Sequence, residues 1–240
     1  MAAIQTKMIM ETIEVKNISR FMEETEFSDG FSSSLLLFRG QPEKGNLLPS
    51  IARSDPSKNT INKEMDLLEQ LKLMGANHLN GIDQNDWDLL VLAQHFGLKT
   101  RLLDWTSNPL TAMWFACTDK SEGDVYVYSL EANTLLSKQA YKTSVFQQGK
   151  TIAFQPKLNN HRIISQHGYF TAHRYSKGSN KFVSLEKNPK IKKLLVEYSI
   201  PEKSRPGIIE SLDMYGINSK TLFPDLEGLC RHLNWKHNIT

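Results

Sequence analysis

The sequence predicts one α+β domain, because strand-like and helix-like patterns alternate along the chain. Short apolar runs and runs of period two mark strands, and apolar residues three or four positions apart mark helices. Apolar residues make up 40% of the 240 residues and charged residues 23%, which is typical of a globular protein and excludes a coiled coil or a disordered tail. Since no linker or internal repeat divides the chain, we expect residues 1–240 to form a single domain.

The expected strands and helices can be placed by residue number. Strands are expected at 34–40, 100–106, 124–130, 152–154, 169–175 and 194–200. Helices are expected from about residue 18, at 60–75 and 85–96, from Pro109, at 205–215, and from Pro224 to about 236. Asn108 is a candidate cap, because a polar residue before a proline is a common helix start. Residues 157–168 are expected to form a loop with a helical turn, and 176–189 a hairpin.

Positive charge is concentrated in one stretch of the chain. The net charge is only +3, yet residues 138–205 carry 14 lysines and arginines against 3 acidic residues. Such a stretch favours a polyanionic partner, and a solvated basic face is the alternative. The aromatic residues among these charges either stack on nucleic-acid bases or lie in the core; they are Tyr141, Phe146, Tyr169, Phe170 and Tyr175.

The cysteines and the apolar runs indicate the expected environment. Cys117 and Cys230 are too few for a disulfide framework and lack metal-binding spacing, so no metal is expected. The N-terminus lacks an apolar stretch of signal-peptide length, and no run approaches the roughly 18 apolar residues of a membrane span. We therefore expect a reduced, cytoplasmic protein with no membrane partner.

The first candidate site is Phe38-Arg39-Gly40-Gln41, at the end of an apolar strand. A buried arginine needs an anionic or carbonyl partner, because its charge is costly to desolvate alone. Gly40 would let a ligand approach the backbone closely. The alternative is that Arg39 pairs with a structural carboxylate.

The second candidate site places amide, imidazole, guanidinium, carboxylate and hydroxyl groups among apolar residues between 94 and 106. Its members are Gln94, His95, Thr100, Arg101, Asp104, Trp105 and Thr106. Asp104 is expected to be half buried and to need a partner, which Arg39 or Arg101 could supply. An internal salt-bridge network is the alternative.

Two further clusters lie later in the chain. Arg162 and Gln166 are four residues apart, so they share a face if this stretch is a helical turn. Asp225 and Glu227 follow Pro224 and are favourable at the start of a C-terminal helix. The chain contains no P-loop or dinucleotide-binding glycine motif, no HExxH and no GxSxG, so the enzyme classes that these motifs define are not indicated.

In this order, the clusters resemble the FRG-domain family, named for its Phe-Arg-Gly motif. The resemblance rests on FRGQ (38–41), LLPSIAR (47–53), QHFGLKTRLLDWTSNPLTAMWFA (94–116), RIISQHGYFT (162–171) and GINSKTLFPDLEGL (216–229). It therefore implies an FRG-type domain whose motif-bearing core runs from about 34 to 236.

The resemblance further implies a distant similarity to the ADP-ribosyltransferase fold, in which two small packed β-sheets form an NAD-binding cleft with surrounding helices. The implied catalytic residues are Arg39, Asp104, Thr106 and Gln166. The implied NAD-binding residues are Arg39, Gly40, Gln41, Gln94, His95, Thr100, Arg101, Trp105 and Arg162. Gln166 stands where the fold usually has a glutamate, and glutamine cannot supply a full negative charge. Either Asp104, Asp225 or Glu227 replaces it, or the site is weak or inactive.

The expected function is then transfer of ADP-ribose from NAD to a nucleic acid, with RNA favoured and bound by residues 138–205. The family context implies a toxin or anti-phage defence protein, which an antitoxin or chaperone would restrain. Three alternatives remain open. They are an NAD glycohydrolase on the same fold, a non-catalytic nucleic-acid-binding module, and a ribonuclease that uses His95, His161, His167 or His173.

Overall fold

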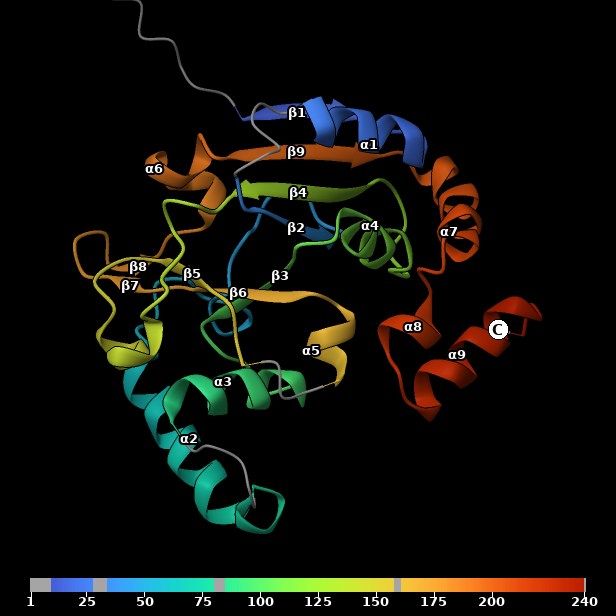
Figure 1. The fold of residues 1–240 in the computed structure, drawn as a ribbon. Helices are drawn as coiled ribbons and strands as arrows, with labels where there is room; N and C mark the ends of the chain where they lie inside the picture. Colours follow the sequence, from blue (N-terminus) through green and yellow to red (C-terminus); the bar gives the residue numbers. More distant parts are fainter. Residues whose placement is uncertain (1–9, 28–33, 80–84, 158–160, 240) are drawn as a thin grey trace, which may run out of the picture.

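The structure is a computed structural model that describes residues 10–27, 34–79, 85–157 and 161–239. Its strands form one seven-stranded mixed sheet, in the order β1-β9-β4-β2-β3-β6-β5, and a two-stranded ribbon, β7-β8 (Figure 1). The strands of the large sheet are β1 (Glu11–Glu14), β2 (Leu36–Gln41), β3 (Leu102–Thr106), β4 (Val125–Glu131), β5 (Ile152–Phe154), β6 (Gly168–Ala172) and β9 (Leu195–Ile200). The expected α+β class is therefore confirmed.

The large sheet is nearly divided between β2 and β3. These strands pair at one position only, Phe38 with Thr106, whereas β2 pairs with β4, and β3 with β6, along their whole lengths. The expectation of two small packed sheets is thus corrected, because this single pair keeps both halves in one sheet. Beyond the pair the strands diverge, and the candidate site lies at this divergence.

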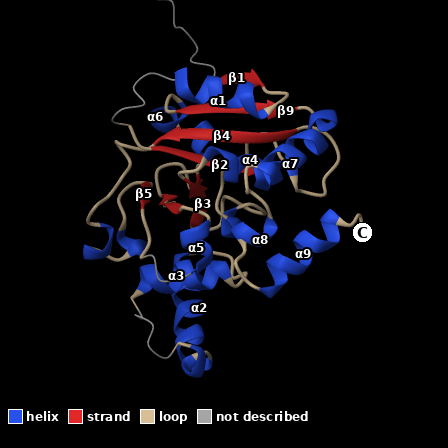
Figure 2. Cartoon of the chain, turned by 45° about the vertical axis from the view of Figure 1, so that its right-hand side comes forward, coloured by secondary structure: helices blue, strands red, loops and turns tan. Residues whose placement is uncertain are grey.

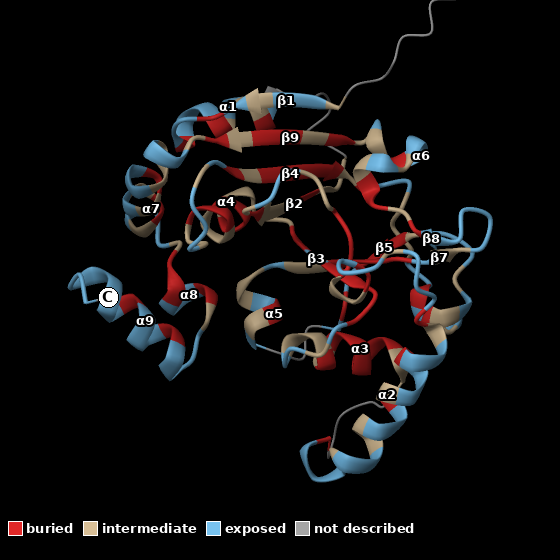
Figure 3. Ribbon diagram, turned by 180° about the vertical axis from the view of Figure 1, so that it is seen from behind, coloured by how far each residue is buried: buried red, intermediate tan, exposed pale blue. Residues whose placement is uncertain are grey.

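Helices cover each half of the sheet separately (Figure 1). The helices α1 (Ile18–Phe27), α4 (Pro109–Cys117) and α7 (Arg205–Met214) pack on the half formed by β2, β4 and β9, where Phe21, Phe38, Met113, Tyr198 and Leu212 share one core. The helices α2 (Ile61–Met74) and α3 (Asp86–His95) pack on the half formed by β3, β5 and β6. Figure 3 shows that β4, β9 and α3 are largely buried, whereas much of α2 is exposed.

The remaining elements are short, apart from the C-terminal helix. They are α5 (His161–Ser165), α6 (Pro189–Lys192), α8 (Ser219–Leu222), α9 (Leu226–Lys236), β7 (Tyr175–Ser176) and β8 (Lys181–Phe182). In Figure 2, α8 and α9 lie together at the edge of the molecule, beside α5. None of the helices in the described part of the chain combines the length and hydrophobicity that a bilayer crossing requires.

Most expected elements are present, with shifted ends. The Asn108 side chain accepts hydrogen bonds from the backbone N–H groups of Leu110 and Thr111, which confirms it as a helix cap. The strand expected at 169–175 ends at Ala172, and Tyr175 instead begins the ribbon, which confirms the expected hairpin. The strand β1 was not expected, because its four residues alternate weakly and are positioned by parallel pairing with β9.

Candidate functional site

A cavity of about 690 Å³ opens where β2 and β3 diverge. Its walls come from both strands, from α4, from the turn between α5 and β6, and from the loop after β2. Of the sequence-predicted residues, it is lined by Arg39, Gly40, Gln41, His95, Asp104, Trp105, Thr106 and Gln166. Segments far apart in the sequence therefore meet here.

Arg39 bridges the gap between the two strands. Its Nη1 donates to the backbone carbonyl of Asp104 at 3.0 Å and lies 3.7 Å from Asp104 Oδ2, and its Nε donates to Gln41 at 3.1 Å. Burial lowers the pKa of Arg39 to about 10, an effect that Asp104 opposes and nearby Arg53 reinforces. The guanidinium stays charged at neutral pH and is held in one orientation.

Gly40 and Gln41 support the site in ways the sequence did not indicate. A Cβ on Gly40 would lie 1.9 Å from the carbonyl oxygen of Ala112, so the close approach at this glycine is made by α4. Packing against α4 is thus a reason for the glycine that we did not expect, and the role of Gly40 in ligand approach stays a prediction, since Gly40 lines the cavity. The amide of Gln41 donates to the carbonyls of Glu43 and Gly45, which shapes the loop after β2. Gln41 thus connects that loop to Arg39.

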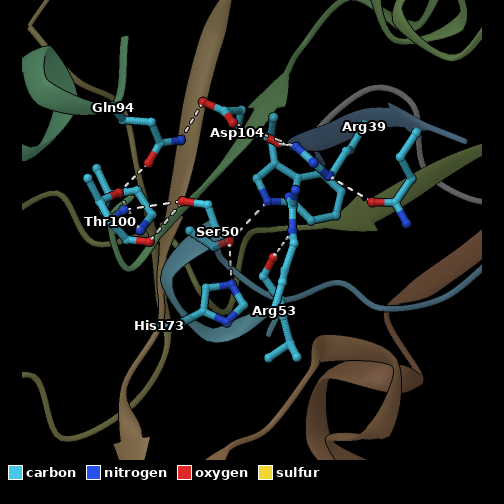
Figure 4. A network of polar contacts seen from close by, with 12 residues as sticks. Arg39, Ser50, Arg53, Gln94, Thr100, Asp104 and His173 are labelled. Carbon is cyan, nitrogen blue, oxygen red and sulfur yellow. Dashed lines mark hydrogen bonds and ion pairs between the residues drawn. The ribbon is translucent and has the colours of Figure 1, made fainter. Parts of the chain in front are cut away.

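A chain of polar contacts holds the Asp104 carboxylate from the other side (Figure 4). Gln94 donates to Asp104 Oδ1 at 2.7 Å, and Gln94 in turn accepts a hydrogen bond from the Thr100 hydroxyl. The backbone N–H of Thr100 donates to Ser50 at 3.2 Å. Gln94 and Thr100 therefore orient Asp104 and do not themselves line the cavity. The Asp104 side chain is 60% exposed, more than the half burial that we expected.

Thr106 and Gln166 are brought together, through the backbone of Gln166. The Thr106 hydroxyl donates to the Gln166 carbonyl at 2.7 Å and accepts from the N–H of Asn108. The Gln166 side-chain amide donates to the carbonyl of Leu222 at 3.0 Å. The Thr106 hydroxyl is thus fully used in tying β3 to the turn before β6, while the Gln166 Oε1 atom has no hydrogen bond within the described residues.

Arg101 lies in the core and does not reach the cavity. It makes two hydrogen bonds to the buried Glu64 carboxylate, at 2.9 and 2.8 Å, and its guanidinium lies over the Phe146 ring at 4.6 Å. The side chains of Arg101 and Glu64 are each 1% exposed. The expectation that Arg101 binds NAD is therefore wrong for this cavity. Arg101 instead forms the internal salt bridge that was the alternative for this segment.

Arg162 and Trp105 also have structural partners. Arg162 binds Asp225 at 2.5 Å and Glu227 at 3.4 Å, which ties α5 to the start of α9, and it is not among the residues that line the cavity. The N–H of Gly228 and the Arg162 guanidinium lower the pKa of Asp225. The Trp105 indole donates to Thr171 at 3.0 Å, and Trp105 is buried although it forms part of the cavity wall.

The histidines differ in their access to the cavity. His95 lies at the C-terminal end of α3 and lines the cavity, and burial and Arg162 lower its pKa, which favours the neutral form. His173 is 2% exposed, and burial lowers its pKa to about 3, with Arg39 and Arg101 acting in the same direction. A buried, neutral His173 cannot serve as a surface acid or base in RNA cleavage.

Three charged residues of the cavity were not among those predicted. Arg53 is exposed at the rim, where its Nε donates to the carbonyl of Leu48, and Glu43 and Asp119 line the cavity as well. Arg53 lies in LLPSIAR, one of the motifs that carry the family resemblance, and this motif could have identified it as a site residue. Nothing in the sequence singled out Glu43 or Asp119, because the fold alone brings them to the site.

A second, larger cavity of about 1220 Å³ lies between α2 and α3. It is lined mostly by leucine and other apolar side chains and adjoins the first cavity at His95 and Ile163. We place the candidate site in the smaller cavity, because oriented charges converge only there in the described part of the chain.

The basic segment is divided between structural and surface roles. Lys157 pairs with Asp88, and Arg205 donates to carbonyls at the end of α4. Six other lysines lie on the β7-β8 ribbon and around α6, at the end of the sheet away from α5 and α8 (Figure 1): Lys177, Lys181, Lys187, Lys190, Lys192 and Lys193. Among the described residues, no lysine lines the candidate cavity, although other residues of the segment do, and its role in binding nucleic acid stays a prediction.

Comparison with known families gives one result. Residues 34–125 match the family model of the FRG domain, and this range holds Arg39, Arg53, Gln94 and Asp104. This segment of the chain therefore carries an FRG domain. The later motifs that include Arg162 and Gln166 lie outside the matched range. No curated protein and no solved structure matches the chain.

Proposed function

We propose that the cavity between β2 and β3 binds NAD and transfers its ADP-ribosyl group to a nucleic acid, with RNA favoured. The observation that carries this proposal is the pairing of Arg39 and Asp104. A fixed guanidinium lies 3.7 Å from an exposed carboxylate at the bottom of a cavity of about 690 Å³. Cavities of this size are typical of small-molecule sites.

The cations of the cavity fit a diphosphate. Arg39 lies at the bottom and Arg53 at the rim, and guanidinium groups bind phosphate oxygens through paired hydrogen bonds. Both belong to motifs that support the family resemblance. The similarity to the ADP-ribosyltransferase fold, with NAD in a cleft between two halves of a sheet, remains part of this proposal.

The reaction breaks the bond between C1′ of the ribose and the nicotinamide nitrogen. The electron pair of that bond leaves with nicotinamide, and the ribose passes through an oxocarbenium-like state. An acceptor hydroxyl or base nitrogen then forms a bond to C1′ and gives its proton to a carboxylate or to water. A fixed carboxylate stabilises the developing positive charge, and Asp104 is the one that the network of Gln94 and Arg39 orients.

Gln166 would then bind the ribose and would not supply the negative charge that stabilises the oxocarbenium-like state. Its amide is engaged by Leu222, which leaves Oε1 to accept a hydrogen bond from a ribose hydroxyl. Asp225 and Glu227 are held by Arg162 outside the cavity, so they do not replace the missing glutamate. Asp104 takes that electrostatic role in this proposal.

A second candidate function is NAD hydrolysis, with water as the acceptor. The observation that favours it is that no lysine lines the cavity in the described part of the chain, so the cavity walls offer no lysine to a nucleic-acid backbone. A toxin or anti-phage role, restrained by an antitoxin or chaperone, would follow from either activity. A ribonuclease is less well supported, because His95 is the only histidine lining the cavity among the described residues.

The experiment follows the fate of NAD labelled in its adenosine part. The purified protein is incubated with this NAD alone, with RNA, and with DNA, and both free nicotinamide and label in nucleic acid are measured. Label in RNA supports transfer, and nicotinamide release without labelled nucleic acid supports hydrolysis. Arg39→Ala should abolish both products, while Arg20→Ala, an exposed arginine on α1, should not change them. Unchanged activity in Arg39→Ala, or no NAD consumption at all, would overturn the proposal.

A further inference from the structure

A third cavity, of about 500 Å³, lies between α4 and the C-terminal helices α7, α8 and α9. It adjoins the candidate site, because Phe115 and Asp119 line both cavities. Its walls include Trp114 and Phe115 from the motif at 94–116 and Phe223 from the motif at 216–229, for which the resemblance implies no role. A ligand held there would lie beside the proposed NAD cavity.

Four aromatic rings form its apolar walls. Phe223 lies 6.0 Å from Trp114 and 6.1 Å from Phe115, measured between ring centroids, and Trp235 stands across the cavity beside His232. Trp235 is 42% exposed, and the other three rings are partly exposed. Aromatic faces that stay accessible around a cavity are suited to stacking with planar ligands.

Cations stand next to these rings. The Arg231 guanidinium lies 4.4 Å from the centre of the Phe223 ring and 3.3 Å from Glu227, and exposed Lys120 lines the opposite wall from the end of α4. Accessible rings with positive groups beside them are the combination that binds single-stranded nucleic acid, because bases stack while phosphates are neutralised.

The floor of the cavity carries polar groups. His232 is 4% exposed, and its Nδ1 atom has no hydrogen-bond partner within the described residues; the nearest carboxylate oxygen, Asp213 Oδ1, is 3.7 Å away. Asn218 donates to that same oxygen at 2.7 Å. Buried polar atoms are normally satisfied, so an unpaired histidine nitrogen beside a cavity is itself unusual.

We infer that this cavity binds a nucleobase of a single-stranded RNA, next to the nucleotide that is modified. The inference rests on the proposed function, since it names the place where the acceptor is held. The surface lysines do not line the candidate site in the described part of the chain, whereas this cavity shares Phe115 and Asp119 with it. Figure 3 shows α9 at the edge of the molecule and largely exposed. An RNA strand therefore fits better than the adenine of NAD, because a long ligand bound beside α9 can continue into solvent.

The test measures RNA binding in the absence of NAD. A short fluorescent oligoadenylate is titrated into the protein, and its Kd is compared between the wild type and Trp235→Ala. Loss of one stacking ring should weaken binding by about tenfold, and Trp235→Phe should restore most of it. Lys120→Gln should reduce the salt dependence of the Kd. Phe96→Ala removes a still more exposed ring outside this cavity and should leave the Kd unchanged.

The inference would be overturned if Trp235→Ala and wild type bind RNA with the same Kd, or if the protein does not bind RNA at all. It would also be overturned if NAD displaces the oligonucleotide from wild type but not from Trp235→Ala. That result would show that the cavity binds the adenine of NAD and not a base of the RNA. Failure of the proposed function looks different: RNA binds in a Trp235-dependent manner, but no NAD is consumed. Thermal melting of each variant confirms that it is folded.

Discussion

Arg39 and Asp104 meet at the place where β2 and β3 stop pairing. The Arg39 side chain donates to the Asp104 carbonyl at 3.0 Å, so a guanidinium takes up a backbone acceptor that a paired strand would otherwise engage. The same side chain lies 3.7 Å from the Asp104 carboxylate. The interruption of the sheet and the charges of the candidate site are therefore one structural feature.

Asp104→Asn should lower the turnover of NAD by about 10²- to 10³-fold, which is typical for loss of one preorganised electrostatic group. The substitution keeps the size of the side chain and removes only its charge, and the exposed position limits any effect on stability. The measurement is kcat for nicotinamide release together with Tm. Glu43→Gln, which neutralises another acid of the same cavity, is the matched control. A larger loss in that control would move the catalytic charge to Glu43.

Arg53→Gln should raise the KM for NAD by about tenfold and leave kcat nearly unchanged. A cation at the rim contacts the diphosphate equally in the ground state and the transition state, and loss of such uniform binding affects KM alone. Lys58→Gln is the control, because Lys58 is an exposed cation that does not line the cavity. A fall in kcat with unchanged KM would show that Arg53 acts in the chemical step.

Glu64→Gln should lower the free energy of unfolding by about 3–5 kcal/mol, because it leaves the buried Arg101 charge without its carboxylate. The double variant Glu64→Leu, Arg101→Met should recover much of this loss, since it removes both buried charges. Denaturant unfolding measures the free energy of unfolding of both variants. Removing the exposed ion pair of Arg20 and Glu23 is the control, and it should change that free energy by about zero. Below its Tm the double variant should consume NAD normally, and loss of activity there would place Arg101 in the site.

The contrast between Arg39 and Arg101 shows what the sequence could predict. Both arginines stand beside apolar strand residues in distinctive motifs, and both were expected to bind NAD. The partner of Arg101 is Glu64, on a helix 37 residues earlier in the chain, and only the fold reveals that contact. Local periodicity placed most strands and helices because burial repeats along each element, but it carries no information about which distant carboxylate an arginine meets.

The pairing of β2 with β3 and the positions of the acidic residues in the cavity were likewise not predictable from local sequence patterns. The pattern of apolar residues predicted β2 and β3 individually, but not that they pair at one position. Glu43 and Asp119 reach the cavity from a loop and from the end of α4, where nothing in their neighbours in sequence marks them. Asp104 was identified because it interrupts an apolar strand, which is a local signal.

Gly40→Ala should destabilise the protein severely, by about 3 kcal/mol or more, because the new methyl group would lie 1.9 Å from the Ala112 carbonyl and 2.6 Å from the Ala116 nitrogen. Both atoms belong to the α4 backbone, which cannot move aside cheaply. Gly149→Ala is the matched control, since a Cβ there meets no atom within 4 Å. Soluble expression and Tm are measured for both. A stable Gly40→Ala that has lost only NAD binding would instead support contact between Gly40 and a ligand.

Stability should fall as the pH is lowered below about 6.5, and His173 should account for part of this fall. Burial lowers its pKa to about 3 in the folded protein, whereas an unfolded chain has the ordinary value near 6.5. Between these two values the unfolded state binds a proton that the folded state does not, so the free energy of unfolding decreases as the pH decreases. At pH 5 the expected contribution is roughly 2 kcal/mol relative to pH 8. Denaturant unfolding of wild type and His173→Gln at both pH values isolates it, because the variant removes the titrating ring; equal pH dependence in the two proteins would show that His173 is not held neutral in the fold.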